Sequence, residues 1–185
     1  MIVVFTGSHS CGKSSLIERC KDWDSVVCVN SVTRSTITDK ERRIDGIKKL
    51  DDSQYKILEK IIEFMNDLIE ENKKKPNNIY LCDRSVFDFI AYTRAFYKRG
   101  LVSDQCLKLI EDTCQNIYTC YDLICYLPIE FPIVDDGVRS LDEQLRTDVD
   151  TEICRQLKDK NNVITLSGSY EARLKTLRTV LNNKR

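Results

Sequence analysis

The sequence has no hydrophobic run of the length that a transmembrane helix needs. Its apolar N-terminus, residues 2–5, leads directly into a glycine-containing segment, which is not the pattern of a signal peptide. It also lacks an excess of charge, because 29 basic and 29 acidic residues give a formal net charge of +0. No global positive field is therefore available to hold nucleic acid or a membrane surface. These absences predict a cytoplasmic protein without a membrane partner.

Cysteine is abundant, but the pairs that would make it a metal or disulfide framework are missing. The nine cysteines are an odd number and include no C-x-x-C pair. Several, such as Cys28, Cys82 and Cys125, lie inside apolar runs. This pattern favours reduced thiols in the core of an intracellular protein. With 185 residues and neither repeats nor a linker, we expect a single domain spanning residues 1–185.

Short β-rich runs alternate with helical patterns along the whole chain. The runs show little polar alternation, which is typical of strands covered on both faces. Strands are predicted at Ile2–Thr6, Val26–Asn30, Asn78–Cys82, Leu123–Leu127 and Val163–Leu166. Helices are predicted at Lys13–Lys21, Asp52–Asn72, Val86–Arg99, Asp104–Tyr118, Leu141–Lys158 and Tyr170–Asn182. This alternation predicts an α/β fold with a parallel sheet and right-handed crossovers.

One segment matches the phosphate-binding P-loop pattern G-x-x-x-x-G-K-[ST] and lies between a predicted strand and a predicted helix. Its glycines let the backbone curl so that N–H groups face phosphate oxygens, and the helix N-terminus adds partial positive charge. The nucleotide-binding residues are then Gly7, Ser8, His9, Ser10, Cys11, Gly12, Lys13, Ser14 and Ser15. Lys13 is predicted to reach the β and γ phosphates of ATP, and Ser14 to ligate Mg²⁺. A glycine-rich turn without a ligand is the alternative.

The predicted strand that ends at Cys82 is followed by Asp83, Arg84 and Ser85. A motor ATPase usually has Asp-Glu at this place, with the Glu activating water. Arg84 in that position favours phosphate transfer to an acceptor over hydrolysis. The strings D-x-x-G and N-K-x-D that a GTPase needs do not occur. The alternative is that Asp83 and Arg84 form an ion pair at the end of the strand.

These residues resemble the nucleoside- and nucleotide-kinase group of P-loop enzymes. Asp83-Arg84-Ser85 with Ala91-Tyr92 is similar to the D-R-[YWS]-x-x-S-x-x-A-Y segment of the thymidylate-kinase-like branch. Asp88 stands where that branch has serine, and Thr93 replaces a common glutamine, which disfavours thymidylate as the acceptor.

The P-loop itself, the segment 136–139 and the segment 167–169 look closer to the nicotinamide-riboside-kinase-like ATPases. Related domains occur in phage enzymes that phosphorylate hydroxymethylated pyrimidines in DNA.

The resemblance implies a three-layer P-loop NTPase fold with a five-stranded parallel sheet in the order 2-3-1-4-5. It also implies a small helical lid at about residues 128–150. ATP and Mg²⁺ would be the cofactors. Asp83 would be the base, or the carboxylate that organises the metal, near the acceptor hydroxyl. Arg84 would contact the acceptor or the transferred phosphate.

Two arginines near the lid are further catalytic candidates. Ser140 and Glu143 have the spacing of a capping box, which predicts a helix from Leu141 and places Arg139 at its entrance. Arg139 and Arg146 are predicted to close over the γ-phosphate. The alternative for Arg146 is a surface pair with Asp150 at i,i+4.

Candidates for binding the acceptor are Arg34, Gln54, Arg84 and Tyr92. Arg34 follows the second predicted strand, where ligands collect in such sheets. Gln54 begins the long helix and Tyr92 lies one helix face beyond Asp83. Arg34 and Gln54 are equally consistent with loop or surface positions, and Tyr92 with core packing. Arg173 follows the 167–169 turn, and we expect it either to stack on adenine or to solvate the last helix.

The leading hypothesis is a kinase that transfers the γ-phosphate of ATP to a hydroxyl or phosphate of a nucleoside-like acceptor. One alternative acceptor is a hydroxymethyl pyrimidine in DNA. That reading requires a basic surface near Arg34, Arg42, Arg43, Lys48 and Lys49. A second alternative is a regulatory adaptor that binds nucleotide without transferring phosphate. The acceptor and the oligomeric state stay open.

Overall fold

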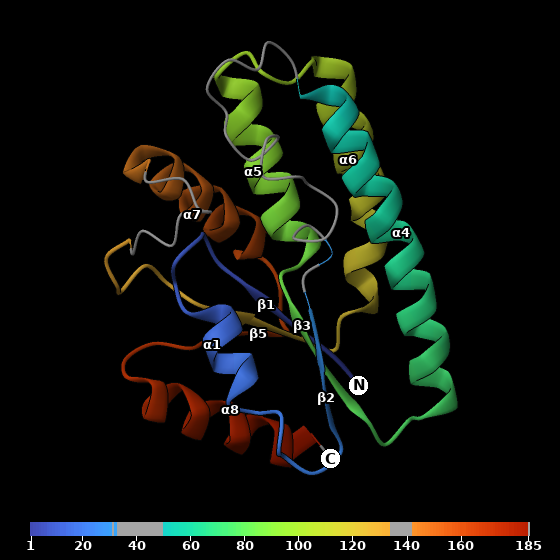
Figure 1. The fold of residues 1–185 in the computed structure, drawn as a ribbon, viewed down its shortest axis with the longest axis vertical. Coiled ribbons are helices and arrows are strands. Elements are labelled where there is room, and N and C mark those ends of the chain that lie inside the picture. The colour runs from blue at the N-terminus through green and yellow to red at the C-terminus, as the bar shows by residue number, and fades with distance from the viewer. Residues whose placement is uncertain (31, 33–49, 134–141, 185) are drawn as a thin grey trace.

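Five parallel strands form a single sheet in the order β2-β3-β1-β4-β5, as predicted (Figure 1). The computed structural model describes residues 1–30, 32, 50–133 and 142–184. The strands are β1 (Ile2–Thr6), β2 (Val26–Val29), β3 (Ile79–Asp83), β4 (Leu123–Tyr126) and β5 (Val163–Thr165). β3 continues one residue beyond its predicted end, so Asp83 is part of the sheet and pairs with Phe5 of β1. This pairing places Asp83 two residues from the start of the P-loop.

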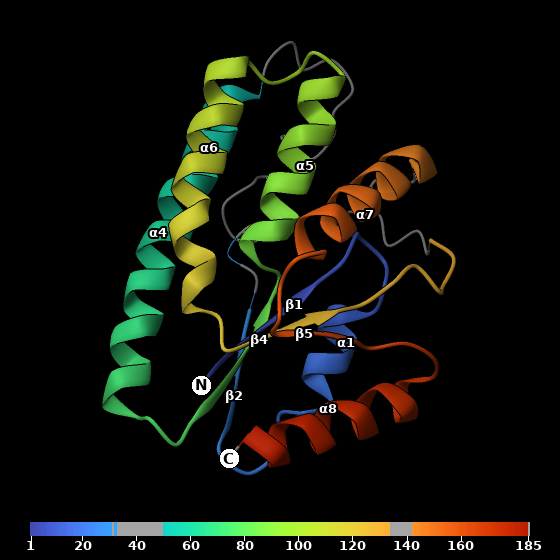
Figure 2. The same ribbon diagram turned by 180° about the vertical axis from the view of Figure 1, so that it is seen from behind.

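The sheet is covered by helices on both faces, which gives the three layers expected (Figures 1 and 2). The helices are α1 (Lys13–Glu18), α4 (Asp51–Lys74), α5 (Val86–Lys98), α6 (Asp104–Ile117), α7 (Glu143–Leu157) and α8 (Tyr170–Lys184), with a 3-10 turn at Tyr118–Cys120. α4, α5, α6 and α7 bury their apolar residues against one face in one hydrophobic cluster. α1 and α8 do so against the other face. Because strand residues alternate between the two clusters, the strands are mostly apolar, and their polar residues Thr6, Asp83 and Thr165 stand at the carboxyl ends.

The apolar stripe of the long helix α4 is buried as its sequence spacing predicts. Ile57, Ile61, Met65 and Leu68 all face the core. Asp51 and Asp52 lie in the first turn of α4, and Lys73 and Lys74 lie in its last turn. These charges complement the partial charges at the two helix ends. None of the helices among the described residues combines the length and apolar character needed to cross a bilayer.

Several helix boundaries differ from the predictions by one to three residues, and two of them have a clear local cause. α1 ends at Glu18 and not at Lys21, because the Cys20 N–H bonds the Ile17 carbonyl and tightens the chain into a turn. α7 begins at Glu143 and not at Leu141. Its N-cap is Asp142, whose Oδ1 accepts a hydrogen bond from the Leu145 N–H at 2.8 Å. Ser140 and Leu141, and with them part of the predicted lid, lie outside the described residues.

The cap of α7 can be tested by substitution. Asp142→Ala is expected to lower the free energy of unfolding by about 1 kcal/mol, because it removes the side-chain acceptor at the helix start. Asp142→Asn is the matched control, since Asn caps nearly as well as Asp. Urea unfolding measures both variants. If Ser140→Ala lowers the free energy of unfolding by this amount and Asp142→Ala does not, the cap is the Ser140 and Glu143 capping box predicted from the sequence and not Asp142.

Candidate functional site

The segment between β1 and α1 has a backbone shape that its glycines make possible. Gly7 has φ +150° and Gly12 has φ +89°. A Cβ atom on Gly7 would lie 2.5 Å from the Leu127 carbonyl oxygen and 2.9 Å from Cys11 Sγ. No side chain fits in that space, so the loop packs directly on the end of β4. Ser10, with φ +58°, adds a further left-handed residue to the curl.

The outer side of this loop is held by two buried arginines. Arg146 of α7 is 1% exposed and donates from Nε to the His9 carbonyl at 3.2 Å and from Nη2 to the Ser10 carbonyl at 3.3 Å. Arg173 of α8 is 0% exposed and donates from Nη1 to the Cys11 carbonyl at 2.8 Å. In a trans peptide, the carbonyl and the following N–H point in opposite directions. The N–H groups of residues 10, 11 and 12 are therefore turned away from the arginines.

Both arginines also bind the segment that follows β4. Arg146 Nη2 donates to the Phe131 carbonyl at 2.6 Å. Arg173 Nη2 lies 2.6 Å from Glu130 Oε2, and its guanidinium carbon lies 4.8 Å from the centre of the Phe131 ring. The hydrogen bond from Arg173 is the main cause that lowers the pKa of Glu130. The P-loop, the segment after β4 and the last two helices thus form one hydrogen-bonded unit.

These positions overturn two alternatives from the sequence analysis. Arg146 does not form a surface pair with Asp150, because it is buried and bonds the P-loop. The Asp150 carboxylate instead accepts the Tyr126 hydroxyl at 3.0 Å, and burial raises its pKa. Arg173 does not solvate the last helix, since it is fully buried.

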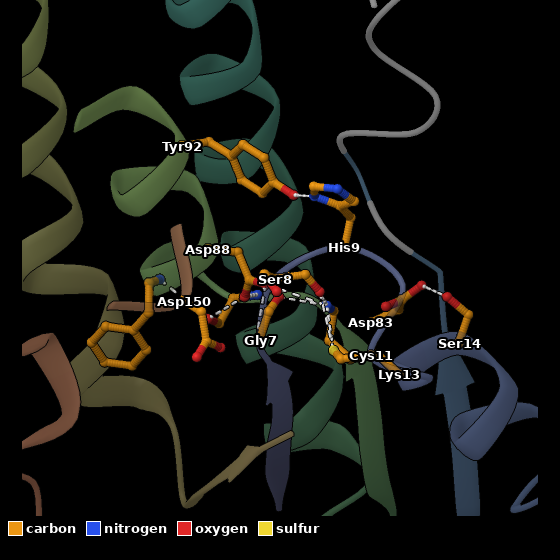
Figure 3. Close-up of polar contacts among 12 residues, drawn as sticks. Gly7, Ser8, His9, Cys11, Lys13, Ser14, Asp83, Asp88, Tyr92 and Asp150 are labelled. Carbon is orange, nitrogen blue, oxygen red and sulfur yellow. Dashed lines mark hydrogen bonds and ion pairs between the residues drawn. The ribbon is translucent and has the colours of Figure 1, made fainter. Parts of the chain in front are cut away.

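Lys13 is folded back over the loop that precedes it (Figure 3). Its Nζ donates to the carbonyls of Gly7 at 2.5 Å and Ser8 at 2.7 Å, and its side chain is 6% exposed. An ammonium group has three N–H donors, and these two bonds fix its position at the loop. Nζ also lies 3.8 Å from Asp88 Oδ1. The ammonium group is thereby held at the loop.

Asp83 and Ser14 meet at the mouth of the loop (Figure 3). Ser14 Oγ donates to Asp83 Oδ2 at 2.7 Å. Asp83 is 8% exposed, and its Oδ1 is buried without a hydrogen-bond partner among the described residues. An orphaned carboxylate oxygen beside a hydroxyl suits Mg²⁺, which takes few protein oxygens and completes its shell with water and phosphate. No group of three or more His, Cys, Asp or Glu side chains suited to a metal occurs in the described part of the chain. The residues present therefore fit Mg²⁺ held together with a nucleotide.

Arg84, Tyr92 and His9 form a second connection between the strand end and the loop. Arg84 has φ +86°, a strained value for a residue with a side chain. Its guanidinium carbon lies 5.6 Å from the centre of the Tyr92 ring, and the Tyr92 hydroxyl lies 2.9 Å from His9 Nδ1. Burial opposes the charge of Arg84, but Tyr92 and the carboxylates of Asp88 and Asp83 raise its pKa overall. Tyr92 thus lies between the P-loop and Arg84.

Asp83 and Arg84 line two cavities at once. The first is polar and is lined by residues 9–15 of the loop and the start of α1. The second is apolar, with walls that include Val4, Ile61, Phe64, Met65 and Tyr121. The apolar cavity holds about 40 Å³, less than a ligand-sized pocket, so its side chains must move to admit a ring. The two cavities meet at the carboxyl ends of β1 and β3, where ligands bind in such sheets.

A larger cavity, of about 310 Å³, lies at the amino ends of the strands. It is lined by Trp23, Arg178 and the first residues of β2 and β3. The P-loop is at the other end of the strands, so this cavity is separate from the site.

The remaining predicted residues are not all brought to the site. Gln54 is 4% exposed, and its Oε1 accepts the Thr93 hydroxyl at 2.8 Å, which joins α4 to α5. It is not among the described residues that line the two cavities. Arg34 and Arg139 lie outside the described residues, as does the basic group Arg42, Arg43, Lys48 and Lys49.

Asp88 belongs to the site, although no motif in the sequence predicted a functional role for it. It is 1% exposed, and its carboxylate bonds both the P-loop and the start of α5. The available signal was the Ser85-x-x-Asp88 spacing, which resembles a capping box. That spacing predicts the contact with Ser85 but not the contact with Gly7.

The buried position of Arg173 leads to a stability prediction. Arg173→Met is expected to lower the free energy of unfolding by about 2–3 kcal/mol, because the carbonyls of Cys11 and Gly168 lose a charged donor and the exposed Glu130 loses its ion-pair partner. Arg178→Met, an exposed arginine on the same helix, is the control. Urea unfolding compares the two variants. A loss for Arg173→Met no larger than that for the control would contradict the buried anchor.

The comparisons with known proteins agree with this architecture. The family model described as AAA domain matches residues 2–173. No protein of curated function matches the sequence significantly.

Three solved structures, all from P-loop nucleoside or nucleotide kinases, share the fold. NadR in complex with NAD and AMP-PNP has a TM-score of 0.67 at 17% identity, over 98% of this chain and 48% of its own. Deoxyadenosine kinase from M. mycoides has a TM-score of 0.67 at 13% identity, over 99% of this chain and 100% of its own. Thymidylate kinase from Candida albicans has a TM-score of 0.68 at 12% identity, over 99% of this chain and 91% of its own.

This chain spans about half the length of the NadR chains that it matches. At these identities the similarity shows a shared fold, whereas the family model covers most of the sequence. The chain belongs to the AAA domain family.

Proposed function

We propose that this chain is an ATP-dependent phosphotransferase that moves the γ-phosphate of ATP to a hydroxyl or phosphate of a nucleoside-type acceptor. One observation carries the proposal: Asp83 and Arg84 line both the polar cavity at the P-loop and the apolar cavity beside it. A donor phosphate in the first cavity and an acceptor in the second would meet at these two side chains. The NadR, deoxyadenosine kinase and thymidylate kinase folds support the same class of reaction.

The donor side relies on charge and position. The N–H groups turned inward by Arg146 and Arg173 would cradle the phosphates, and Lys13 would bind the β and γ phosphates with its ammonium group. Phosphoryl transfer spreads negative charge over the γ-phosphate oxygens, and fixed donors stabilise that charge without reorganising. A loop held from behind by buried side chains meets this requirement.

Ser14 and Asp83 are the residues that would hold Mg²⁺. When bound, the ion would neutralise charge on the β and γ phosphates. The serine hydroxyl, which bonds Asp83 Oδ2, and the orphaned Oδ1 of Asp83 are the oxygens that we assign to this role.

The acceptor side uses the same carboxylate and the arginine next to it. Asp83 would receive the proton of the acceptor hydroxyl at a carboxylate oxygen, and Arg84 would contact the acceptor or the transferred phosphate. The apolar walls of the second cavity suit a flat ring such as a nucleobase. Tyr92 would hold Arg84 in place, and Arg34 is proposed to bind an acidic acceptor.

The buried contacts of Arg146 revise its proposed role. Its guanidinium is already bonded to three carbonyl oxygens, so we assign it to holding the loop and not to closing over the phosphate. Arg139 keeps its proposed role over the γ-phosphate.

The kinase assignment predicts the loss of transfer in Lys13→Ala. Removing the ammonium group is expected to lower kcat/KM by about a thousandfold or more, because its charge on the γ-phosphate is lost. Lys21→Ala, which removes an exposed lysine paired with Glu18, is the control. The assay is transfer of radiolabel from ATP to nucleosides, nucleoside monophosphates, nicotinamide riboside and DNA with hydroxymethyl pyrimidines. Product on DNA alone would favour the alternative acceptor, and ATP binding with no product on any acceptor would favour an adaptor.

The metal assignment predicts a change in the magnesium dependence of Ser14→Ala. The Mg²⁺ concentration for half-maximal transfer is expected to rise about tenfold or more, as when a metal site loses a supporting oxygen. The measurement is a magnesium titration at saturating ATP for wild type and variant. An unchanged midpoint would remove Ser14 from the metal site.

A further inference from the structure

The carboxylate of Asp88 joins the two halves of the site. Asp88 lies in the first turn of α5, directly after the Asp83-Arg84-Ser85 segment, and is 1% exposed. Figure 3 shows it between α5 and the start of the P-loop. Its side chain is within reach of Gly7, Lys13 and Ser85, which belong to different parts of the site.

Each oxygen of this carboxylate accepts hydrogen bonds from one side of the site. Oδ2 accepts the Ser85 N–H at 2.9 Å and the Ser85 hydroxyl at 2.8 Å, on the acceptor side. Oδ1 accepts the Gly7 N–H at 3.3 Å and lies 3.8 Å from Lys13 Nζ, on the donor side. All the nearby protein groups that the carboxylate bonds are therefore donors. A carboxylate, which only accepts, satisfies both sides together.

We propose that Asp88 is a positioning residue that sets the P-loop and Lys13 in register with the Asp83-Arg84-Ser85 segment. The inference rests on the proposed phosphotransferase function and deepens it. Transfer requires the donor phosphate and the acceptor hydroxyl to be aligned, and a misplacement of about 1 Å can cost a hundredfold in rate. Asp88 acts through Gly7, Lys13 and Ser85 and contacts neither substrate.

The isosteric variant Asp88→Asn separates this role from simple packing. Asparagine has the same shape, but one of its two polar ends is an NH₂ group. That group must face either the Gly7 N–H and Lys13, or the Ser85 N–H, and in both cases two donors meet. One of the two connections is lost while the volume of the side chain is kept.

The control for lost helix capping is Ser103→Ala. Ser103 caps α6, where its hydroxyl accepts the Cys106 N–H at 3.2 Å, and it belongs to neither cavity. Asp88→Glu is the second variant. Glutamate is favoured at this capping-box position, so it keeps the charge and the bond to Ser85 but moves the other oxygen relative to Gly7.

Two readouts test the proposal. The first is steady-state transfer from ATP, with kcat and KM for ATP determined separately. Asp88→Asn is expected to lower kcat about tenfold to a hundredfold. KM for ATP is expected to change less, since removing a negative charge near the triphosphate offsets the loss of loop order. The second is amide hydrogen exchange of residues 7–13 without nucleotide, which is expected to quicken in Asp88→Asn but not in Ser103→Ala.

The possible outcomes distinguish a failure of the positioning role from a failure of the kinase function. A kcat and a loop exchange rate in Asp88→Asn equal to those of Ser103→Ala would overturn the positioning role. If Asp88→Asn does not fold, the same readouts on Asp88→Glu decide, with wild-type values again overturning it. If the wild-type protein transfers no phosphate, but residues 7–13 exchange faster in Asp88→Asn than in Ser103→Ala, the positioning role is supported and the kinase function is rejected.

Discussion

The site depends on two buried guanidinium groups that hold three consecutive carbonyls of the P-loop. Burying a charged side chain is unfavourable unless its donors are bonded. Arg146 and Arg173 meet that condition because the curled loop turns the carbonyls of residues 9–11 toward them. The carbonyls, in turn, need donors because they are withdrawn from water. The curl of the loop and the burial of the arginines therefore stabilise each other, and the N–H groups of the same peptides point away from the arginines.

The sheet register connects this arrangement to Asp83, on the proposed acceptor side of the site. β3 pairs with β1 so that Asp83 lies beside Phe5, two residues before Gly7. From there, the bonds Ser14–Asp83, Gly7–Asp88 and His9–Tyr92 connect the loop to β3 and α5. Residues 69 to 83 positions apart in sequence are thus held by direct bonds. Such a rigid framework suits a reaction whose rate depends on alignment and fixed charge.

Much of the fold was predictable because its signals are local. Apolar runs bounded by turns predicted all five strands, and the P-loop pattern predicted the curled loop between β1 and α1. The roles of Arg146 and Arg173 were not predictable, because their partners lie 137 and 162 residues away. From the sequence, Arg146 was expected to close over the γ-phosphate or to pair with Asp150 at i,i+4, whereas the packing of α7 against the loop buries it. The bond between Gln54 and Thr93 was likewise not predictable, because it depends on how α4 packs against α5. For Asp88, the sequence spacing predicted the bond to Ser85 but not the bond to Gly7.

The most direct test is a crystal structure with Mg²⁺ and a non-hydrolysable ATP analogue. The account predicts phosphates bonded to the inward N–H groups of the loop and to Lys13 Nζ. It also predicts that Arg146 and Arg173 still donate to the carbonyls of residues 9–11. Guanidinium groups that leave those carbonyls to bind the phosphates, or a nucleotide bound away from the loop, would contradict it.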